Sequence, residues 1–267
     1  MIKIGIVGCG TIGSAIAFAI DEGKVEAILY ALWDKEKGKA EALLNLLKNQ
    51  VPKIHPPSSW IEDVDLLVES ASQSAVGELL PLAIEKGKDV LIMSVGGLIG
   101  QEELVRKARE KNCHIYVPSG ALAGLDAVQS ANLGNIKSAT LTTIKPPKAL
   151  EGAPYVQQKG IDLYSFTQPT TIYEGCASEA LKLFPANVNV AAALSLAGIG
   201  AEGTKVKVVV DPQAKTNIHR IEVEGDFGKI TAQTENYPAP SNPRTSYLAI
   251  LSAIALLKKL SSSLRIG

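Results

Sequence analysis

The stretch that decides the fold is Ile4–Gly13, with the sequence Ile-Gly-Ile-Val-Gly-Cys-Gly-Thr-Ile-Gly. It begins as a short apolar run, typical of a strand buried on both faces, and continues into Gly-x-Gly-x-x-Gly where a helical pattern starts. In such a unit the first glycine permits a tight turn, the second lets the backbone approach a pyrophosphate, and the third lets the helix pack near the strand. The helix N-terminus presents free N–H groups and partial positive charge to the phosphates. We therefore predict a dinucleotide-binding turn made by Gly8, Gly10, Thr11, Ile12 and Gly13.

Strand and helix patterns alternate around this unit over residues 1–118. Alternation at this rhythm predicts an α/β domain of the Rossmann type, in which helices cover both faces of a doubly wound parallel sheet. Beyond the first strand and helix, we expect strands at 25–32, 64–69, 89–93 and 114–117, and helices at 37–47, 74–86 and 101–111.

The pattern changes after Pro118. Residues 119–245 carry strand signals rich in Thr, Val and Ile with helical segments between them, which predicts a second, α+β domain with a mixed or antiparallel sheet. The strands are expected at 138–145, 205–210 and 218–225, and the helices at 177–183 and 188–197. The Pro-rich stretch 237–243 is interpreted as an ordered loop or crossing strand. An apolar helix starts at Ser246, and we expect the C-terminal segment 246–267 to pack back on the first domain.

Composition limits the class of partner. The chain has 267 residues, more than one core of about 100–200 residues needs, so two domains are expected. It carries 27 basic and 27 acidic residues, and this balance gives no long-range attraction for nucleic acid or anionic lipid. No apolar run reaches the length of about 20 residues that a membrane span needs. These features predict a small-molecule partner.

The cysteines and the N-terminus indicate the compartment. Cys9, Cys113 and Cys176 are widely spaced and form neither a metal-ligand pattern nor Cys-x-x-Cys. The chain starts directly with a strand pattern and lacks the features of a signal peptide. We expect a cytoplasmic protein with reduced cysteines and no metal site.

Polar residues follow two of the predicted strands at the edge where ligands bind in open α/β folds. Asp34, 21 residues after Gly13, ends the second strand and is placed to accept a hydrogen bond from a ribose 2′-hydroxyl. An acid there favours NAD over NADP, although Lys35 and Lys37 could accept a 2′-phosphate. The alternative role of Asp34 is to cap the next helix.

The third strand ends in a small-residue turn. Ala71 and Ser72 lie in this turn, and their small side chains would let the nicotinamide half of a dinucleotide pass. The alternative is that the turn only caps the helix that follows.

The chain has three histidines that could handle a proton. His55 lies in a Pro-rich loop, and His114 opens a strand beside Cys113, so both are interpreted as non-catalytic. His219 starts a second-domain strand and is the candidate catalytic group, because an imidazole with an ordinary pKa of about 6.5 exchanges protons near neutral pH. Asn189, at a helix start, could donate its amide to cofactor or substrate.

Six motifs together resemble the L-aspartate dehydrogenase family. They cover nearly the whole chain, in order, and the second-domain motifs are far more specific than the glycine pattern. They are Gly8–Gly13, the PSGALAGLD stretch from Pro118, Lys145-Pro146-Pro147, the FPANVNVAA stretch from Phe184, Ile218–Gly225 and Asn242–Ser246.

The resemblance implies oxidation of L-aspartate with NAD or NADP to iminosuccinate, which hydrolyses to oxaloacetate and ammonia and can feed NAD biosynthesis. It also implies that His219 is catalytic, that Ala123 and Asn189 contact the cofactor, and that the protein is a homodimer joined through the second domain. The two carboxylates of such a substrate need cationic or amide donors, for which Lys145 and Arg244 are the candidates. Each could equally be a solvated surface charge.

Three alternatives are weaker. A reductase similar to dihydrodipicolinate reductase has the same two-domain plan, but its paired histidines have no counterpart here. The catalytic lysine context of a homoserine-dehydrogenase-like enzyme is not evident. A non-catalytic redox sensor would need an interaction module, for which the chain has no spare segment.

Overall fold

A computed structural model describes residues 1–185 and 188–264, with the side chains of residues 188, 243 and 244 outside the description. The chain divides into two compact units. The first unit is Met1–Pro118 with Ala249–Gly267, and the second is Ser119–Leu248.

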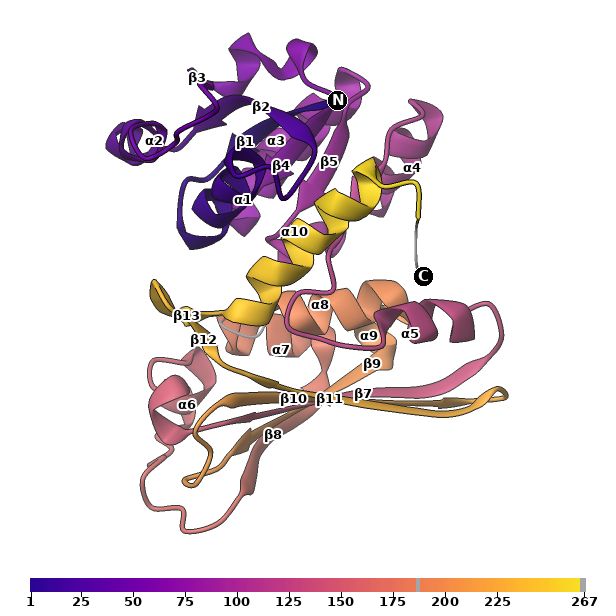
Figure 1. Cartoon of the computed structure of the whole chain (residues 1–267). Helices are drawn as coiled ribbons and strands as arrows, with labels where there is room; N and C mark the ends of the chain where they lie inside the picture. Colours follow the sequence, from indigo (N-terminus) through magenta and orange to yellow (C-terminus); the bar gives the residue numbers. More distant parts are fainter. Residues whose placement is uncertain (186–187, 265–267) are drawn as a thin grey trace. The chain divides into compact units, whose positions relative to one another are not determined.

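The first unit is built on a six-stranded parallel sheet, which confirms the predicted doubly wound architecture (Figure 1). The third strand in chain order was not predicted, because it has only two residues and offers no periodicity. In sheet order the strands are β3 (Lys53–Ile54), β2 (Ala27–Trp33), β1 (Ile2–Val7), β4 (Leu66–Glu69), β5 (Asp89–Ile92) and β6 (Ile115–Tyr116).

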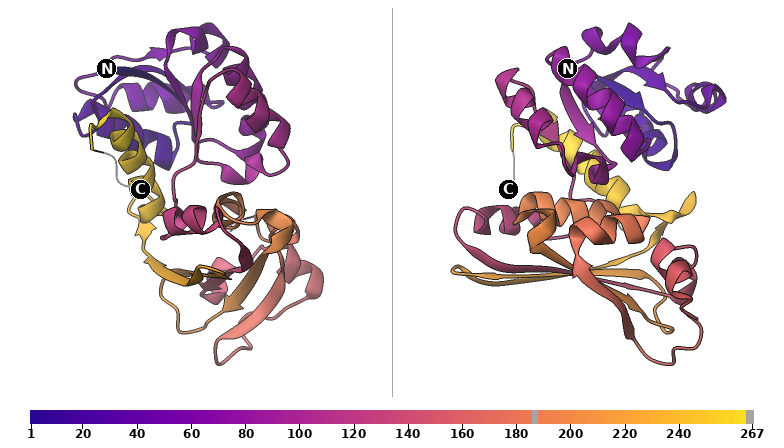
Figure 2. Two further views of the ribbon diagram at one scale, coloured as in Figure 1. Left: turned by 90° about the vertical axis from the view of Figure 1, so that its right-hand side faces the viewer. Right: turned by 180° about the vertical axis from the view of Figure 1, so that it is seen from behind.

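Helices cover both faces of this sheet (Figures 1 and 2). One face packs against α1 (Thr11–Asp21), α2 (Lys37–Leu44) and α10 (Tyr247–Ser261). The other packs against α3 (Gln73–Glu85), and α4 (Glu102–Glu110) packs against α3.

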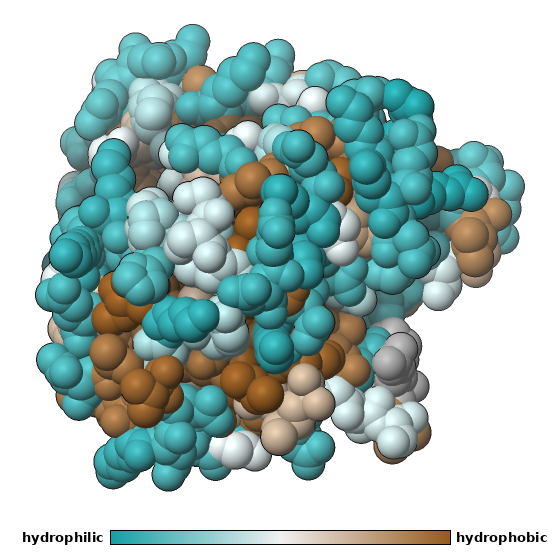
Figure 3. Space-filling view, turned by 90° about the horizontal axis from the view of Figure 1, so that it is seen from above, coloured by the Kyte–Doolittle hydropathy of each residue, from teal (hydrophilic) through white to brown (hydrophobic). Residues whose placement is uncertain are grey.

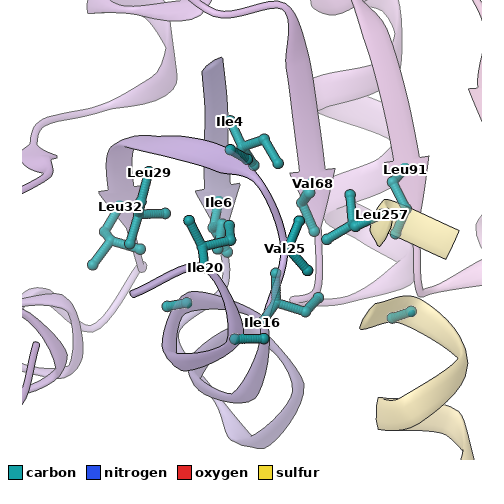
Figure 4. Packing of buried hydrophobic residues seen from close by; sticks show 14 of the residues in the cluster. Ile4, Ile6, Ile16, Ile20, Val25, Leu29, Leu32, Val68, Leu91 and Leu257 are labelled. Atoms are coloured by element: carbon teal, nitrogen blue, oxygen red, sulfur yellow. The ribbon is translucent and has the colours of Figure 1, made fainter. Parts of the chain in front are cut away.

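The C-terminal helix α10 contributes to the same core as the N-terminal strands. Leu257 of α10 lies beside Val68 and Leu91 of the central strands (Figure 4). Leu257 is 2% exposed and both strand residues are fully buried. The last three residues, 265–267, lie outside the described part of the chain.

The second unit has a five-stranded sheet in which only β7 and β9 run parallel, so the predicted mixed sheet is confirmed. Figure 1 shows α5, α7, α8 and α9 on one face of this sheet. In sheet order the strands are β11 (Gly228–Asn236), β10 (Asn217–Gly225), β7 (Ile136–Lys145), β9 (Thr204–Val210) and β8 (Thr170–Cys176). The helices are α5 (Leu125–Ala131), α6 (Pro154–Lys159), α7 (Ala177–Leu183), α8 (Val188–Ala197) and α9 (Gly200–Gly203).

Two strands of this sheet were missed from the sequence. β11 is an edge strand whose outward positions are polar and exposed, so its apolar signal is weak, and its pairing with β10 through the hairpin at Gly225 and Gly228 fixes it instead. β8 is the other edge strand.

The Pro-rich stretch forms a small hairpin of β12 (Pro238–Ala239) and β13 (Asn242–Ser246). The remaining elements are the 3-10 helices η1 (Pro57–Ser59), η2 (Ile61–Asp63), η3 (Val95–Leu98) and η4 (Pro147–Ala149).

Alternation along β7, β9 and β10 places apolar side chains on the face that packs against the helices. Leu141, Val206 and Ile221 are almost fully buried there. Polar side chains interrupt this apolar face near the C-terminal end of β7, at Thr143 and Lys145, and they mark the candidate site described below.

The surface carries both polar and apolar side chains. The face seen in Figure 3 is mostly hydrophilic, with several apolar patches between polar side chains. Within the described residues, no helix combines the length and apolar character needed to cross a membrane.

Candidate functional site

The three glycines of the Gly-x-Gly-x-x-Gly motif are needed for different structural reasons. Gly8 has a φ of +96°, which L side chains rarely adopt. A Cβ on Gly13 would lie 1.8 Å from the Gly8 carbonyl oxygen, so only glycine lets α1 pack this close to the turn. A Cβ on Gly10 would meet no atom within 4 Å. The first and third glycines are therefore required by the fold, whereas Gly10 leaves open space beside the turn.

The N-terminus of α1 is suited to an anion. Its N-cap residue is Gly10, which has no side chain to cap the first turn, and Thr11 and Ile12 in that turn are half-buried. Ser70, the residue after β4, stabilises the glycine turn, because its hydroxyl donates a hydrogen bond to the Gly8 carbonyl at 2.8 Å. A helix N-terminus of this kind suits a pyrophosphate group, and the predicted contacts of Gly8–Gly13 with a dinucleotide stay a prediction.

Asp34 lies directly after β2 and contacts the glycine turn. Its Oδ2 accepts a hydrogen bond from the backbone N–H of Cys9 at 2.7 Å, and its Oδ1 accepts one from the N–H of Glu36 at 2.8 Å. Glu36, not Asp34, is the N-cap residue of α2. A carboxylate offers about four acceptor positions, so Asp34 retains capacity for a ribose hydroxyl.

Cys9 is not a nucleophile in this setting. Burial, and secondly the charge of Asp34, raise the pKa of its thiol to about 12. The thiol therefore stays protonated at neutral pH.

Substituting two of the glycines separates folding from binding. We expect Gly10→Ala to change the free energy of unfolding by less than about 1 kcal/mol and to weaken dinucleotide binding about tenfold or more, because the new methyl group fills ligand space. Gly13→Ala should destabilise the protein by about 2 kcal/mol through overpacking. Denaturant unfolding and NADH fluorescence titration measure the two effects. A Gly10→Ala variant that binds NADH normally contradicts this interpretation of the turn.

The turn after β4 is organised by a buried carboxylate. The backbone N–H groups of Ala71 and Ser72 donate to Glu69 Oε1 at 2.7 and 2.9 Å. The Ser72 hydroxyl accepts from the N–H of Ala75 and caps α3, so the capping role considered for this turn is real. Ala71 and Ser72 are both exposed, which leaves them accessible to a ligand as well. Glu69 was not predicted as a site residue, although an acid closing an apolar strand pattern is a visible signal.

In the second unit, the sheet brings together three polar side chains. β10 pairs antiparallel with β7 so that His219 lies opposite Thr143, and Lys145 is on the same face two residues further along β7. Thr143 Oγ1 and His219 Nδ1 are 3.1 Å apart. Thr143 is fully buried, and His219 and Lys145 are each only 6% exposed. The interpretation of Lys145 as a solvated surface charge is therefore wrong.

Burial controls the charge of both titratable groups. It lowers the pKa of Lys145 to about 8. Burial, and then the charge of Lys145, lower the pKa of His219 to about 3. The ordinary imidazole pKa assumed from the sequence is corrected by this environment, because two cations cannot share a desolvated pocket. At neutral pH His219 is neutral, and Lys145 is charged but titrates just above neutrality.

Lys145 has no counter-ion among the residues that the structure describes. Among the described residues its ammonium group has no hydrogen-bond or ion-pair partner. A buried charge is normally paired, so an unpaired one indicates a place for an anionic ligand.

Thr143 was missed from the sequence, because a threonine in a strand pattern normally signals only β-propensity. We expect Thr143→Val to lower kcat about 10–100-fold, since the hydroxyl fixes the orientation and tautomer of the buried imidazole. Thr143→Ser should restore most of the activity, which a purely steric role of the side chain does not predict. Thr142→Val, one residue along β7 and half-buried, is the matched control for steady-state kinetics. Equal losses in both valine variants contradict the proposed contact.

The other predicted residues of the second unit lie near chain turns. Ala123 is exposed in the segment before α5, and Asn189 is exposed at the start of α8. The segment before α5 is held by β11, because Thr234 Oγ1 and Asn236 Nδ2 donate to the Ala121 carbonyl at 2.7 and 3.2 Å. Arg244 lies in β13, and its side chain is outside the described part of the structure.

Comparison with known proteins gives full-length matches. A family model described as aspartate dehydrogenase, C-terminal, matches residues 126–260, and one described as homoserine dehydrogenase, NAD binding domain, matches residues 8–118. An L-aspartate dehydrogenase of Methanosarcina barkeri is 51% identical over 270 residues, and one of Nitrosopumilus maritimus is 43% identical over 275 residues, in both cases covering 100% of each chain. The crystal structure of aspartate dehydrogenase from Thermotoga maritima matches with a TM-score of 0.77 at 28% identity, covering 100% of both chains. A hyperthermophilic archaeal homoserine dehydrogenase matches at 16% identity with a TM-score of 0.59, which shows a shared fold alone.

Proposed function

The chain belongs to the L-aspartate dehydrogenase family, and from this premise we propose that it oxidises L-aspartate with a nicotinamide dinucleotide. The observation that carries the proposal is the buried, unpaired Lys145 beside His219, because it provides a site for an anionic substrate next to a group that can hold a proton. The glycine turn, the N-terminus of α1 and Asp34 would hold the dinucleotide. When bound, the nicotinamide supplies a hydride acceptor.

Lys145 would bind a substrate carboxylate. A carboxylate supplies the missing counter-ion, and in a desolvated site the pair is worth far more than on the surface. Arg244 is the second candidate donor for the dicarboxylate.

His219 would handle the proton. Oxidation of the amine removes a hydride from carbon and a proton from nitrogen, leaving iminosuccinate, and water then releases oxaloacetate and ammonia. Burial is the main cause of the low pKa of His219, and the charge of Lys145 is the second. A carboxylate on Lys145 offsets that second effect, so substrate binding would make the imidazole a better proton acceptor. Thr143 keeps one ring nitrogen engaged and leaves the other for the substrate or for water.

NAD is the proposed cofactor in preference to NADP. The Asp34 carboxylate at the end of β2 accepts hydroxyl donors and repels a 2′-phosphate. Lys35 and Lys37, both exposed next to it, are the feature that would permit NADP as a second cofactor. Ala123 and Asn189 are further proposed cofactor contacts.

The test is dinucleotide reduction followed by absorbance, with NAD and NADP each offered a panel of amino acids. We expect turnover with L-aspartate, faster with NAD, and the reverse reaction with oxaloacetate plus ammonia. D-aspartate, L-glutamate and L-asparagine are the discriminating substrates, because each changes the stereochemistry, length or charge that Lys145 and Arg244 would recognise. Dinucleotide binding without aspartate turnover in either direction would refute the substrate assignment and leave the fold untouched.

We also propose an oligomeric state and a cellular compartment for the protein. We propose a homodimer joined through the second unit, since α5, α7, α8 and α9 cover only one face of its sheet. Light scattering in solution gives the mass that decides this. The three free cysteines suit the reducing cytoplasm, where iminosuccinate can supply NAD biosynthesis.

A further inference from the structure

Glu69 is a fully buried carboxylate at the end of β4. It accepts four hydrogen bonds from two different turns. Oε1 accepts from the N–H groups of Ala71 and Ser72 and from the Ser94 hydroxyl, and Oε2 accepts from the Ser94 N–H at 2.9 Å. The side chain thus joins the exit of β4 to the exit of β5.

Its partners are suited to the ionised form. Three of the four donors are backbone N–H groups, which can only donate. No cationic side chain among the described residues pairs with Glu69, so the negative charge is held by dipoles alone. Burial raises the pKa of Glu69, and these hydrogen bonds oppose the rise without cancelling it. The donor geometry, three backbone N–H groups and one hydroxyl on the two carboxylate oxygens, is what favours the ionised form, and no cationic side chain of the described residues neutralises that charge.

The sheet order indicates which half of a bound dinucleotide would lie nearest to the Glu69 carboxylate. The order β3-β2-β1-β4-β5-β6 consists of two mononucleotide-binding halves that meet at β1 and β4. Asp34 follows β2, so the β1–β3 half takes the adenosine side of the dinucleotide. The nicotinamide side then belongs to the β4–β6 half, at the two turns that Glu69 joins.

We propose that Glu69 determines redox-state selectivity, making the site favour the oxidised, cationic nicotinamide over the neutral reduced form. The two forms differ by one positive charge on the ring, and a negative charge in a medium of low dielectric attracts only the cation. Selectivity of this kind suits an enzyme that consumes the oxidised dinucleotide. The inference rests on the proposed function, because it requires dinucleotide binding.

The experiment compares the Kd of NAD⁺ and of NADH in full-length wild type and Glu69→Gln, by calorimetry and NADH fluorescence. Because glutamine keeps the size and removes the charge, we expect the Kd of NAD⁺ to rise about tenfold more than that of NADH, equivalent to about 1.4 kcal/mol. Equal weakening of both forms means that Glu69 only orders the turns, and overturns the proposal. Wild type that binds neither form overturns the proposed function instead.

Asp34→Asn is the matched control. It removes a carboxylate from the adenosine half, and should weaken NAD⁺ and NADH by the same factor. Glu69→Asp keeps the charge and should preserve the wild-type ratio even if both affinities fall. If either control variant changes the ratio of the NAD⁺ Kd to the NADH Kd as much as Glu69→Gln does, the proposal is contradicted. If Glu69→Gln does not fold, the same comparison is made in the Lys145→Met background, which we expect to be more stable.

Discussion

Lys145→Met is expected to abolish aspartate oxidation and to make the folded protein more stable. The pKa of Lys145 falls from 10.5 to about 8 on burial, which corresponds to a cost of about 3 kcal/mol for keeping the charged form in the folded state at pH 7. Methionine fills similar space without that cost. We expect kcat/KM for L-aspartate to fall about 1000-fold or more, since a buried charge pair with the substrate is lost.

The stability gain has a defined pH dependence. Below pH 8 the folded and unfolded wild-type chains both carry the proton, so the full cost is present. Between pH 8 and 10.5 the folded chain loses the proton first, and wild-type stability rises with pH. The difference in unfolding free energy between Lys145→Met and wild type should therefore shrink steadily from pH 8 to pH 10.

Denaturant unfolding at several pH values, with steady-state kinetics, measures both effects. Lys148→Met, three residues along and exposed, is the control, and should change neither activity nor stability by much. Loss of stability in Lys145→Met at pH 7 would show that the lysine is paired in solution, and would remove the argument for an anion site.

His219→Ala is expected to lower kcat about 100- to 10,000-fold and to leave the Kd of NADH within about twofold of wild type. The imidazole is the group beside Lys145 that can take the proton released from the substrate nitrogen, and it lies on the sheet of the second unit rather than in the glycine turn. Stopped-flow absorbance and NADH titration separate turnover from binding. His55→Ala, with an exposed side chain, is the control histidine. Equal losses of turnover and of NADH binding would remove His219 from the chemistry.

The same variant tests the buried, neutral state of the imidazole. Because the folded pKa of His219 is about 3 and the unfolded value is about 6.5, the unfolded chain binds the extra proton between these pH values. Wild-type stability should therefore fall as the pH drops from 6.5 to 3. The His219→Ala variant lacks this contribution, so its unfolding free energy should depend less steeply on pH in that window. An unchanged slope would mean that His219 is solvated.

Local sequence determined the first unit well. Its apolar runs, helical patterns and glycine turn are short-range signals, and its central strands β1, β4 and β5 are buried along most of their length, so pattern and structure coincide there. The fingerprint glycines and Asp34 could be placed because the turn and the strand end are fixed within a few residues of chain. His219 was chosen because the chain has few histidines. The mixed sheet followed from strand signals, but its polar edge strands β8 and β11 did not.

What only the tertiary structure decided is the environment of the charges. Strands β7 and β10 pair although Thr143 and His219 are 76 residues apart in the sequence. This pairing brings the Thr143 hydroxyl into contact with the His219 imidazole and places Lys145 on the same buried face. The four hydrogen bonds of Glu69 likewise come partly from Ser94, 25 residues away. A sequence specifies which groups can ionise, whereas their pKa values depend on solvent exclusion and on neighbours brought in by long-range pairing. The sequence therefore determined the fold of the first unit and the candidate residues, and tertiary packing determined which of those residues are buried, neutral or unpaired.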